Sequence, residues 1–146
     1  MPRCTTVLIV EDHPDVRRTL RDFVQMVLRE LMPQPAEVLL ASGAAEALQI
    51  LASRRVDLVL VDHDMPDMDG LDLIKAIPRT PRIPIVLTTA SVAVAYWSRT
   101  SGADAVLEKP LVHSELKAVL ERLLPSPAAS EPEIIPPAEA GGPAMA

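Results

Sequence analysis

The sequence predicts a doubly wound α/β fold: a parallel five-stranded sheet, built from five strand–helix units, with helices on both faces. Short β-branched apolar runs alternate with longer amphipathic segments along the chain, as expected when helical crossovers connect parallel strands. The third apolar run, residues 56–62, is almost wholly apolar, which is typical of a strand buried on both faces of a sheet. It stops abruptly at Asp62.

The composition sets limits on the class of protein. A chain of 146 residues has room for one domain with a real core, and the hydrophobic share of 49% with 2% aromatics makes that core aliphatic. The net charge of −6 argues against direct binding of nucleic acid. No apolar run reaches the ~18 residues that span a bilayer, and the single cysteine, Cys4, permits no internal disulfide. We expect a soluble, cytoplasmic protein with no direct membrane contact.

Residues 5–10 form the first predicted strand, an apolar run that stops at Glu11. Pro14 suits the first position of a helix, and Asp15 adds a negative charge where the helix dipole favours one. Apolar residues at helical spacing then continue to Leu31, with charged residues on the other side: Arg17, Arg18, Arg21 and Asp22.

The second strand is predicted over residues 37–41. It is less apolar at its start and is therefore expected at an edge of the sheet. An amphipathic helix over residues 44–51 follows. After the third strand, a short helix is predicted over residues 71–77 and is closed by Pro78.

The last two strands are predicted over residues 83–88 and 104–108, and an amphipathic helix over residues 112–123 follows. Residues 90–101 are the least clear segment. They contain weak helix formers, although a position between two strands favours a helix.

The composition changes near residue 126. Residues 1–125 form the predicted folded domain, whereas residues 126–146 are rich in Pro and Ala and lack a periodic apolar face. We expect this tail to be disordered.

Acidic residues follow the first and third strands. If the strands take the flavodoxin-like order 2-1-3-4-5, these two strands are neighbours, and Glu11, Asp12 and Asp62 converge at one end of the sheet. Three close carboxylates raise one another's pKa unless a cation is supplied. Oxygen ligands with room for water suit Mg²⁺. A lone Asp at a strand end is usually a turn residue, so the grouping matters more than any one acid.

Two further groups lie on the same predicted rim. Thr88 or Thr89 ends the fourth strand and offers a hydroxyl, and Lys109 follows the fifth strand. A carboxylate nucleophile, a hard metal, a Lys and a hydroxyl are the equipment for phosphoryl transfer.

In this order and at these strand ends, the residues resemble the receiver domain of two-component response regulators, in the stand-alone, chemotaxis-regulator-like form. The match covers roughly residues 5–124. It rests on Glu11-Asp12, on Asp62 with Met65-Pro66 and Asp69-Gly70, on Thr89-Ala90 and on Lys109-Pro110.

The resemblance implies that Asp62 is the phosphoacceptor, which takes phosphate from a phosphohistidine on a sensor histidine kinase or phosphotransfer protein. It also implies that Glu11, Asp12 and Asp62 hold Mg²⁺ together with the backbone carbonyl of Asp64.

The resemblance further implies that Thr89 hydrogen bonds to the phosphoryl group and that Lys109 pairs with it. Pro66, Gly70, Ala90 and Pro110 would have structural roles in these motifs. The Lys109–Pro110 peptide bond is expected to be cis.

The sequence departs from the family at one position. Receivers usually carry Tyr or Phe three residues before the Lys, and here that residue is Val106. The only Tyr and Trp, Tyr96 and Trp97, lie in the segment after the fourth strand, where they suit a partner surface if exposed and the core if buried.

The predicted function is therefore that of a signalling domain and not of an enzyme. The domain would act through an unknown effector protein, as a phosphorelay intermediate or as a phosphate sink, as a monomer or weak homodimer, alone or as part of a longer protein. The alternatives are a phosphate-independent interaction module, suggested by Val106, and a haloacid-dehalogenase-type phosphatase, suggested by Asp62-His63-Asp64. The phosphatase leaves Glu11-Asp12 unexplained.

Overall fold

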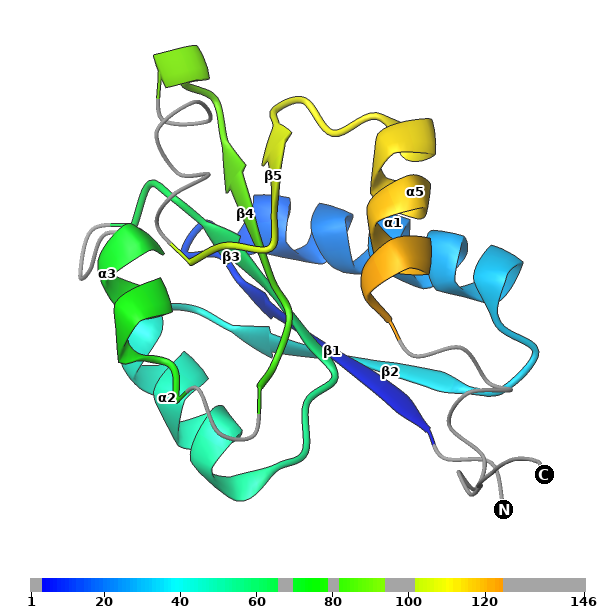
Figure 1. The fold of residues 1–146 in the computed structure, drawn as a ribbon, viewed down its shortest axis with the longest axis horizontal. Coiled ribbons are helices and arrows are strands. Elements are labelled where there is room, and N and C mark those ends of the chain that lie inside the picture. Colours follow the sequence, from blue (N-terminus) through cyan, green and yellow to red (C-terminus); the bar gives the residue numbers. More distant parts are fainter. Residues whose placement is uncertain (1–3, 66–69, 79–81, 94–101, 125–146) are drawn as a thin grey trace, which may run out of the picture.

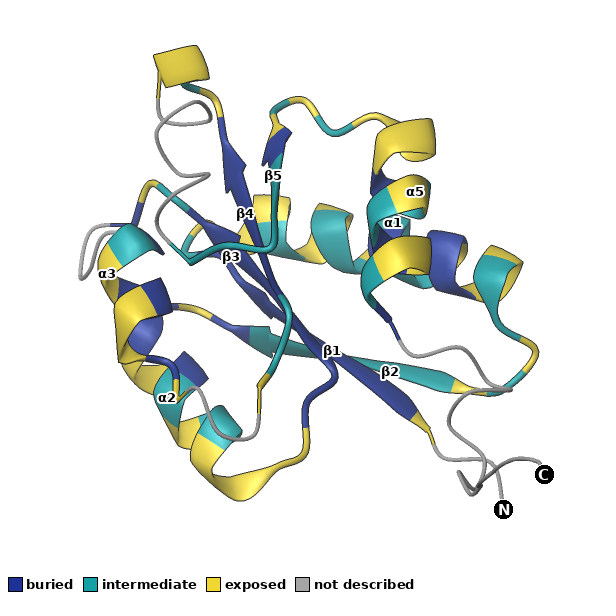
Figure 2. Ribbon diagram, viewed as in Figure 1, coloured by how far each residue is buried: buried dark blue, intermediate teal, exposed yellow. Residues whose placement is uncertain are grey.

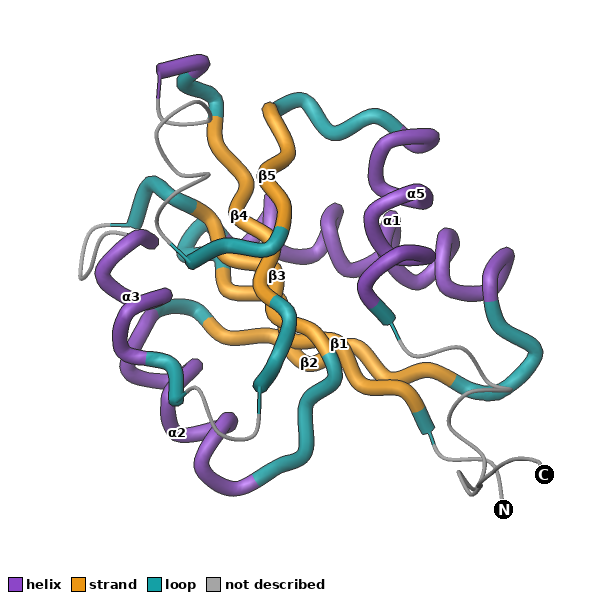
Figure 3. Tube along the Cα trace, viewed as in Figure 1, coloured by secondary structure: helices purple, strands orange, loops and turns teal. Residues whose placement is uncertain are grey.

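The computed structural model describes residues 4–65, 70–78, 82–93 and 102–124. Five parallel strands form one sheet in the order β2-β1-β3-β4-β5 (Figures 1 and 3), which confirms the predicted doubly wound fold. The strands are β1 (Thr5–Val10), β2 (Ala36–Ala41), β3 (Leu58–Asp62), β4 (Ile85–Thr89) and β5 (Ala105–Glu108). The helices described are α1 (Pro14–Leu31), α2 (Ala44–Ser53), α3 (Gly70–Ala76) and α5 (His113–Leu123).

The helices cover both faces of the sheet (Figure 1). Helices α1 and α5 pack on one face and α2 and α3 on the other, so the domain has two cores separated by the sheet. Successive residues of β1 alternate between them: Val7 and Ile9 face α1 and α5, whereas Leu8 and Val10 face α2 and α3. No helix in the described ranges is long and apolar enough to span a membrane.

Burial follows the strand order (Figure 2). Every residue of β1, β3 and β4 is buried, whereas five of the six residues of β2 are only partly buried. The edge position predicted for the second strand is therefore confirmed, because an edge strand has a neighbour on one side only.

Several strand boundaries differ from the prediction by one or two residues: β2 begins at Ala36, β4 at Ile85 and β5 at Ala105. Strand β3 begins at Leu58 and not at Val56, because the buried Asp57 uses its side chain at the start of the sheet: its Oδ2 accepts a hydrogen bond from the Thr6 N–H at 2.8 Å. Strand β4 extends to Thr89, whose carbonyl accepts a hydrogen bond from the Lys109 N–H at 2.8 Å.

Several predictions fall outside the described residues. They are the helix over residues 94–101, the Tyr96–Trp97 pair and the disorder of residues 126–146. Within the segment 90–101, Ala90 and Ser91 are described and are not helical, whereas Val92 and Ala93 are helical. The motif residues Pro66 and Asp69 also lie outside.

The start of α1 matches its predicted signals. Pro14 occupies the first turn, and the preceding His13 caps the helix, with Nδ1 accepting a hydrogen bond from the Val16 N–H at 3.4 Å. Three residues therefore separate the end of β1 from the start of α1, and this short connection keeps its acidic residues at the end of the sheet.

Leu28 tests the packing of α1 on the sheet, since its side chain is 1% exposed. Leu28→Ala is expected to lower the free energy of unfolding by about 2–5 kcal/mol, because it removes buried methyl groups and leaves a cavity. Met26→Ala, on the same helix and 41% exposed, should change it by no more than about 0.5 kcal/mol. If urea unfolding showed equal losses of unfolding free energy for the two variants, the packing of Leu28 between α1 and the sheet would be contradicted.

Candidate functional site

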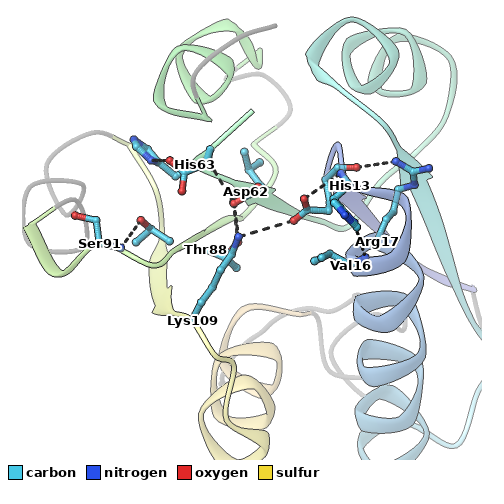
Figure 4. A network of polar contacts seen from close by, with 12 residues as sticks. His13, Val16, Arg17, Asp62, His63, Thr88, Ser91 and Lys109 are labelled. Atoms are coloured by element: carbon cyan, nitrogen blue, oxygen red, sulfur yellow. Dashed lines mark hydrogen bonds and ion pairs between the residues drawn. The ribbon is translucent and has the colours of Figure 1, made fainter. Parts of the chain in front are cut away.

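Three carboxylates gather at the carboxyl end of the sheet (Figure 4). Glu11 and Asp12 follow β1, Asp62 ends the adjacent β3, and one ligand atom from each lies within 4.8 Å of the others. Glu11 and Asp62 are each only 3% exposed, whereas Asp12 is partly exposed. The predicted convergence is confirmed, and it follows directly from the strand order.

Lys109 brings a positive charge to these acids. Its Nζ lies 2.6 Å from Asp62 Oδ1 and 3.9 Å from Glu11 Oε1 (Figure 4). Glu11 and Asp62 therefore share one ammonium group, and the cluster of three carboxylates retains an excess of negative charge. In a largely buried site such an excess is costly unless a proton or a cation offsets it.

Glu11 shows this cost most clearly. The pKa of its carboxyl is raised from 4.5 to about 7. Burial is the largest cause and the charge of Asp62 adds to it, whereas the hydrogen bond from the His13 N–H and the charge of Lys109 lower the pKa. The N–H of His13 occupies Oε2 at 3.2 Å. Among the described residues, Oε1 is the one buried side-chain N or O atom without a hydrogen-bond partner.

The donor set fits a hard divalent cation. The site offers carboxylate oxygens from three residues, one of them an unsatisfied buried oxygen, and no sulfur or imidazole ligand is needed. Oxygen ligands of this kind, with one side open to water, suit Mg²⁺.

The segment after β3 is held close to Asp62. The Asp64 N–H donates to Asp62 Oδ1 at 3.3 Å, and the Asp64 carboxylate is 2.9 Å from His63 Nδ1. The Gly70 N–H donates to the His63 carbonyl at 3.0 Å. A Cβ on Gly70 would lie 2.7 Å from the Asp62 carbonyl oxygen, so only glycine allows this approach.

The two threonines at the end of β4 have different environments. Thr88 is paired with Asp62 in the sheet register, and its hydroxyl donates to the Val61 carbonyl at 3.4 Å. Thr89 is fully buried, and its Oγ1 accepts from the Ser91 N–H at 3.1 Å. Both lie on the rim that carries Asp62, as the sequence predicted.

The end of β5 completes the rim. The Lys109–Pro110 peptide bond is cis, as predicted. Val106, paired with Leu87 of β4, is partly buried and packs against the core under α2 and α3. Ala90, also part of the predicted motifs, is exposed directly after β4.

Sequence reasoning missed Arg17. The sequence predicts Arg17 only as a residue on the charged side of α1. In the structure its Nη1 donates to the backbone carbonyls of Glu11 at 2.9 Å and Asp12 at 3.3 Å. No spacing rule predicts this contact, since it depends on how the helix turns away from the strand.

Comparison with known proteins identifies close similarities. A family model described as the response regulator receiver domain matches residues 7–121. Response regulator MprA of Mycolicibacterium vanbaalenii is 36% identical over 132 residues, which cover 86% of this chain and 54% of the relative. MprA of Mycobacterium ulcerans is 36% identical over 121 residues, covering 81% and 49%. The chain thus spans about half the length of the curated relatives it matches.

Solved structures show the same fold. The chemotaxis protein CheY4 of Vibrio cholerae is 27% identical, with a TM-score of 0.70 over 84% of this chain and all of that chain (100%). The response regulator TrrA of Thermotoga maritima, solved in complex with Mg²⁺ and BeF, is 28% identical, with a TM-score of 0.70 over 82% of this chain and 99% of that one.

Gly70→Ala tests the close approach behind Asp62. The new Cβ meets backbone atoms of Asp62 and His63 at 2.7 and 2.8 Å, so the helix start must shift. We expect a loss of about 1–3 kcal/mol in the free energy of unfolding, measured in urea. Lys75→Ala, an exposed change on the same helix, is the control, and equal stability of the two variants would contradict the contact.

The raised pKa of Glu11 predicts a pH dependence without divalent cations. In the folded chain the Glu11 carboxyl keeps its proton up to about pH 7, whereas the ordinary pKa of a Glu carboxyl is 4.5. Folding therefore takes up a proton between these values, and the free energy of unfolding should fall as the pH rises from 4.5 to 7.

Glu11→Gln removes the titrating group and should flatten that fall, while Glu115→Gln, an exposed change on α5, should leave it in place. The measurement is urea unfolding at a series of pH values in the presence of a chelator. A Glu11→Gln profile parallel to that of the unmodified chain would disprove the assignment.

Proposed function

The chain belongs to the response regulator receiver domain family, signalling domains of two-component systems, and on that premise we propose that Asp62 is its phosphoacceptor. The observation that carries the proposal is the pairing of Asp62 with Lys109 at 2.6 Å beside the unsatisfied oxygen of Glu11. A carboxylate placed between a fixed ammonium group and an acidic oxygen cluster is equipped for phosphoryl transfer with a divalent cation.

In the proposed reaction, a carboxylate oxygen of Asp62 attacks the phosphorus of a phosphohistidine on a sensor kinase or phosphotransfer protein. The new bond joins phosphorus to the Asp62 oxygen. The bond from phosphorus to the imidazole nitrogen breaks, and its electron pair stays on that nitrogen. The product is an aspartyl phosphate on this chain and a free histidine on the donor.

The chain's own residues support this step. Lys109 Nζ, already 2.6 Å from Asp62 Oδ1, stabilises negative charge on the transferred group, and Thr89 offers a hydroxyl to one phosphoryl oxygen. Glu11, Asp12, Asp62 and the backbone carbonyl of Asp64 would hold Mg²⁺. When bound, Mg²⁺ neutralises charge on the phosphoryl oxygens.

We further propose that the phosphorylated domain signals through a protein partner, or passes on or discharges the phosphate. Val106 distinguishes the readout from that of relatives with an aromatic residue at this position. A Val in the core under α2 and α3 has no ring to move between buried and exposed positions, so the signal would reach a partner by another route.

The direct test is phosphorylation of the purified chain by a small-molecule phosphodonor, with and without Mg²⁺, followed by intact mass. We expect one added phosphoryl group that requires Mg²⁺ and is lost in Asp62→Asn. Asp72→Asn, an exposed acid on α3, is the matched control and should be labelled like the unmodified chain.

Other outcomes separate the alternatives. No adduct, under conditions that label another receiver domain, would favour a phosphate-independent interaction module. Repeated turnover of a small phosphate ester, in place of a single addition, would favour a phosphatase.

A further inference from the structure

The side chain of Arg17 turns back from α1 to the segment between β1 and the helix (Figure 4). Its Nη1 donates to the carbonyl oxygens of Glu11 at 2.9 Å and of Asp12 at 3.3 Å. These carbonyls belong to the two residues whose carboxylates enter the acid cluster. A single guanidinium nitrogen therefore fixes the backbone that aims both acids.

Arg17 is well placed to hold this segment. Its backbone N–H donates to the His13 carbonyl at 2.8 Å, so it lies within the first turn of α1, a rigid element packed on the sheet. On the strand side, the Glu11 N–H donates to the Ala41 carbonyl at 3.0 Å. The acidic segment is thus anchored to β2 at its start and to α1 through Arg17.

The positive charge of Arg17 repels a cation, whereas its hydrogen bonds hold the two acidic residues in place. A guanidinium group on the backbone of the acidic segment reduces the attraction that the site exerts on a divalent ion. Arg17 is only half-buried, however, so solvent screens its charge. The geometric effect is not screened, because it sets where the ligand atoms lie.

We propose that Arg17 is a positioning residue for the cation site: by holding the backbone of Glu11 and Asp12 it sets the preference of the site for Mg²⁺ over Ca²⁺. Mg²⁺ demands near-ideal octahedral geometry at short distances, whereas Ca²⁺ accepts looser and more variable coordination. Loosening the acidic segment therefore penalises Mg²⁺ more than Ca²⁺. The inference rests on the Mg²⁺ binding contained in the proposed function.

Arg17→Met tests this inference, because Met retains the unbranched side chain and removes the hydrogen bonds. The matched control is Arg18→Met, which removes a neighbouring positive charge whose partner is Asp15 and not the acidic segment. Amide NMR titrations of the full chain with Mg²⁺ alone and with Ca²⁺ alone give the two dissociation constants. Thermal unfolding without metal reports stability separately.

We expect the Mg²⁺ dissociation constant of Arg17→Met to rise about tenfold, as for other residues that orient metal ligands, and that for Ca²⁺ to rise clearly less. Arg18→Met should match the unmodified chain for both ions. Tighter binding of both ions by Arg17→Met would show that charge repulsion dominates, and equal weakening of both would show a merely structural role. Either result overturns the inference.

The outcome for the unmodified chain separates the two proposals. If the unmodified chain binds Mg²⁺, and Arg17→Met binds both ions with the same dissociation constants as the unmodified chain, only the role of Arg17 is wrong. If the unmodified chain binds no Mg²⁺, the cation site of the proposed function fails as well.

Discussion

The excess of negative charge at the carboxyl end of the sheet is the constraint on which the site depends. Glu11, Asp12 and Asp62 converge there, and the one ammonium group of Lys109 pairs with Asp62 and Glu11. Burial first, and the neighbouring charge of Asp62 second, raise the pKa of Glu11, so its carboxyl is driven toward the neutral form. A cation bound at such a site would offset this negative charge.

The parallel sheet brings the acidic residues together and also holds them in place against their mutual repulsion. Adjacent strand ends are tied to one another, with the His63 N–H bonded to the Thr88 carbonyl and the Lys109 N–H bonded to that of Thr89. The rim that carries acid, hydroxyl and ammonium groups is thus held by main-chain hydrogen bonds that do not depend on charge. The side chains stay close even though the acids repel one another.

The site and the two cores serve separate purposes in the fold. The aliphatic cores on the two faces hold the sheet and its helices, whereas Glu11, Asp62 and Lys109 lie together at the carboxyl end of the sheet. Val106 belongs to the core under α2 and α3 and not to the rim. Under the proposed function, the chemistry of the site and the transmission of its state to a partner would draw on different residues.

The sequence by itself determined the strand–helix alternation, and, once the flavodoxin-like strand order is assumed, the meeting of Glu11, Asp12 and Asp62. Uninterrupted apolar runs identify buried parallel strands, and such strands bring their carboxyl ends together. Only the tertiary structure decided that Asp57 accepts a hydrogen bond from the Thr6 N–H at the start of β1, and that one oxygen of Glu11 lacks a hydrogen-bond partner. It alone placed Arg17 on the carbonyls beside the acids. These contacts depend on loop paths and rotamers, which the spacing of apolar residues does not encode.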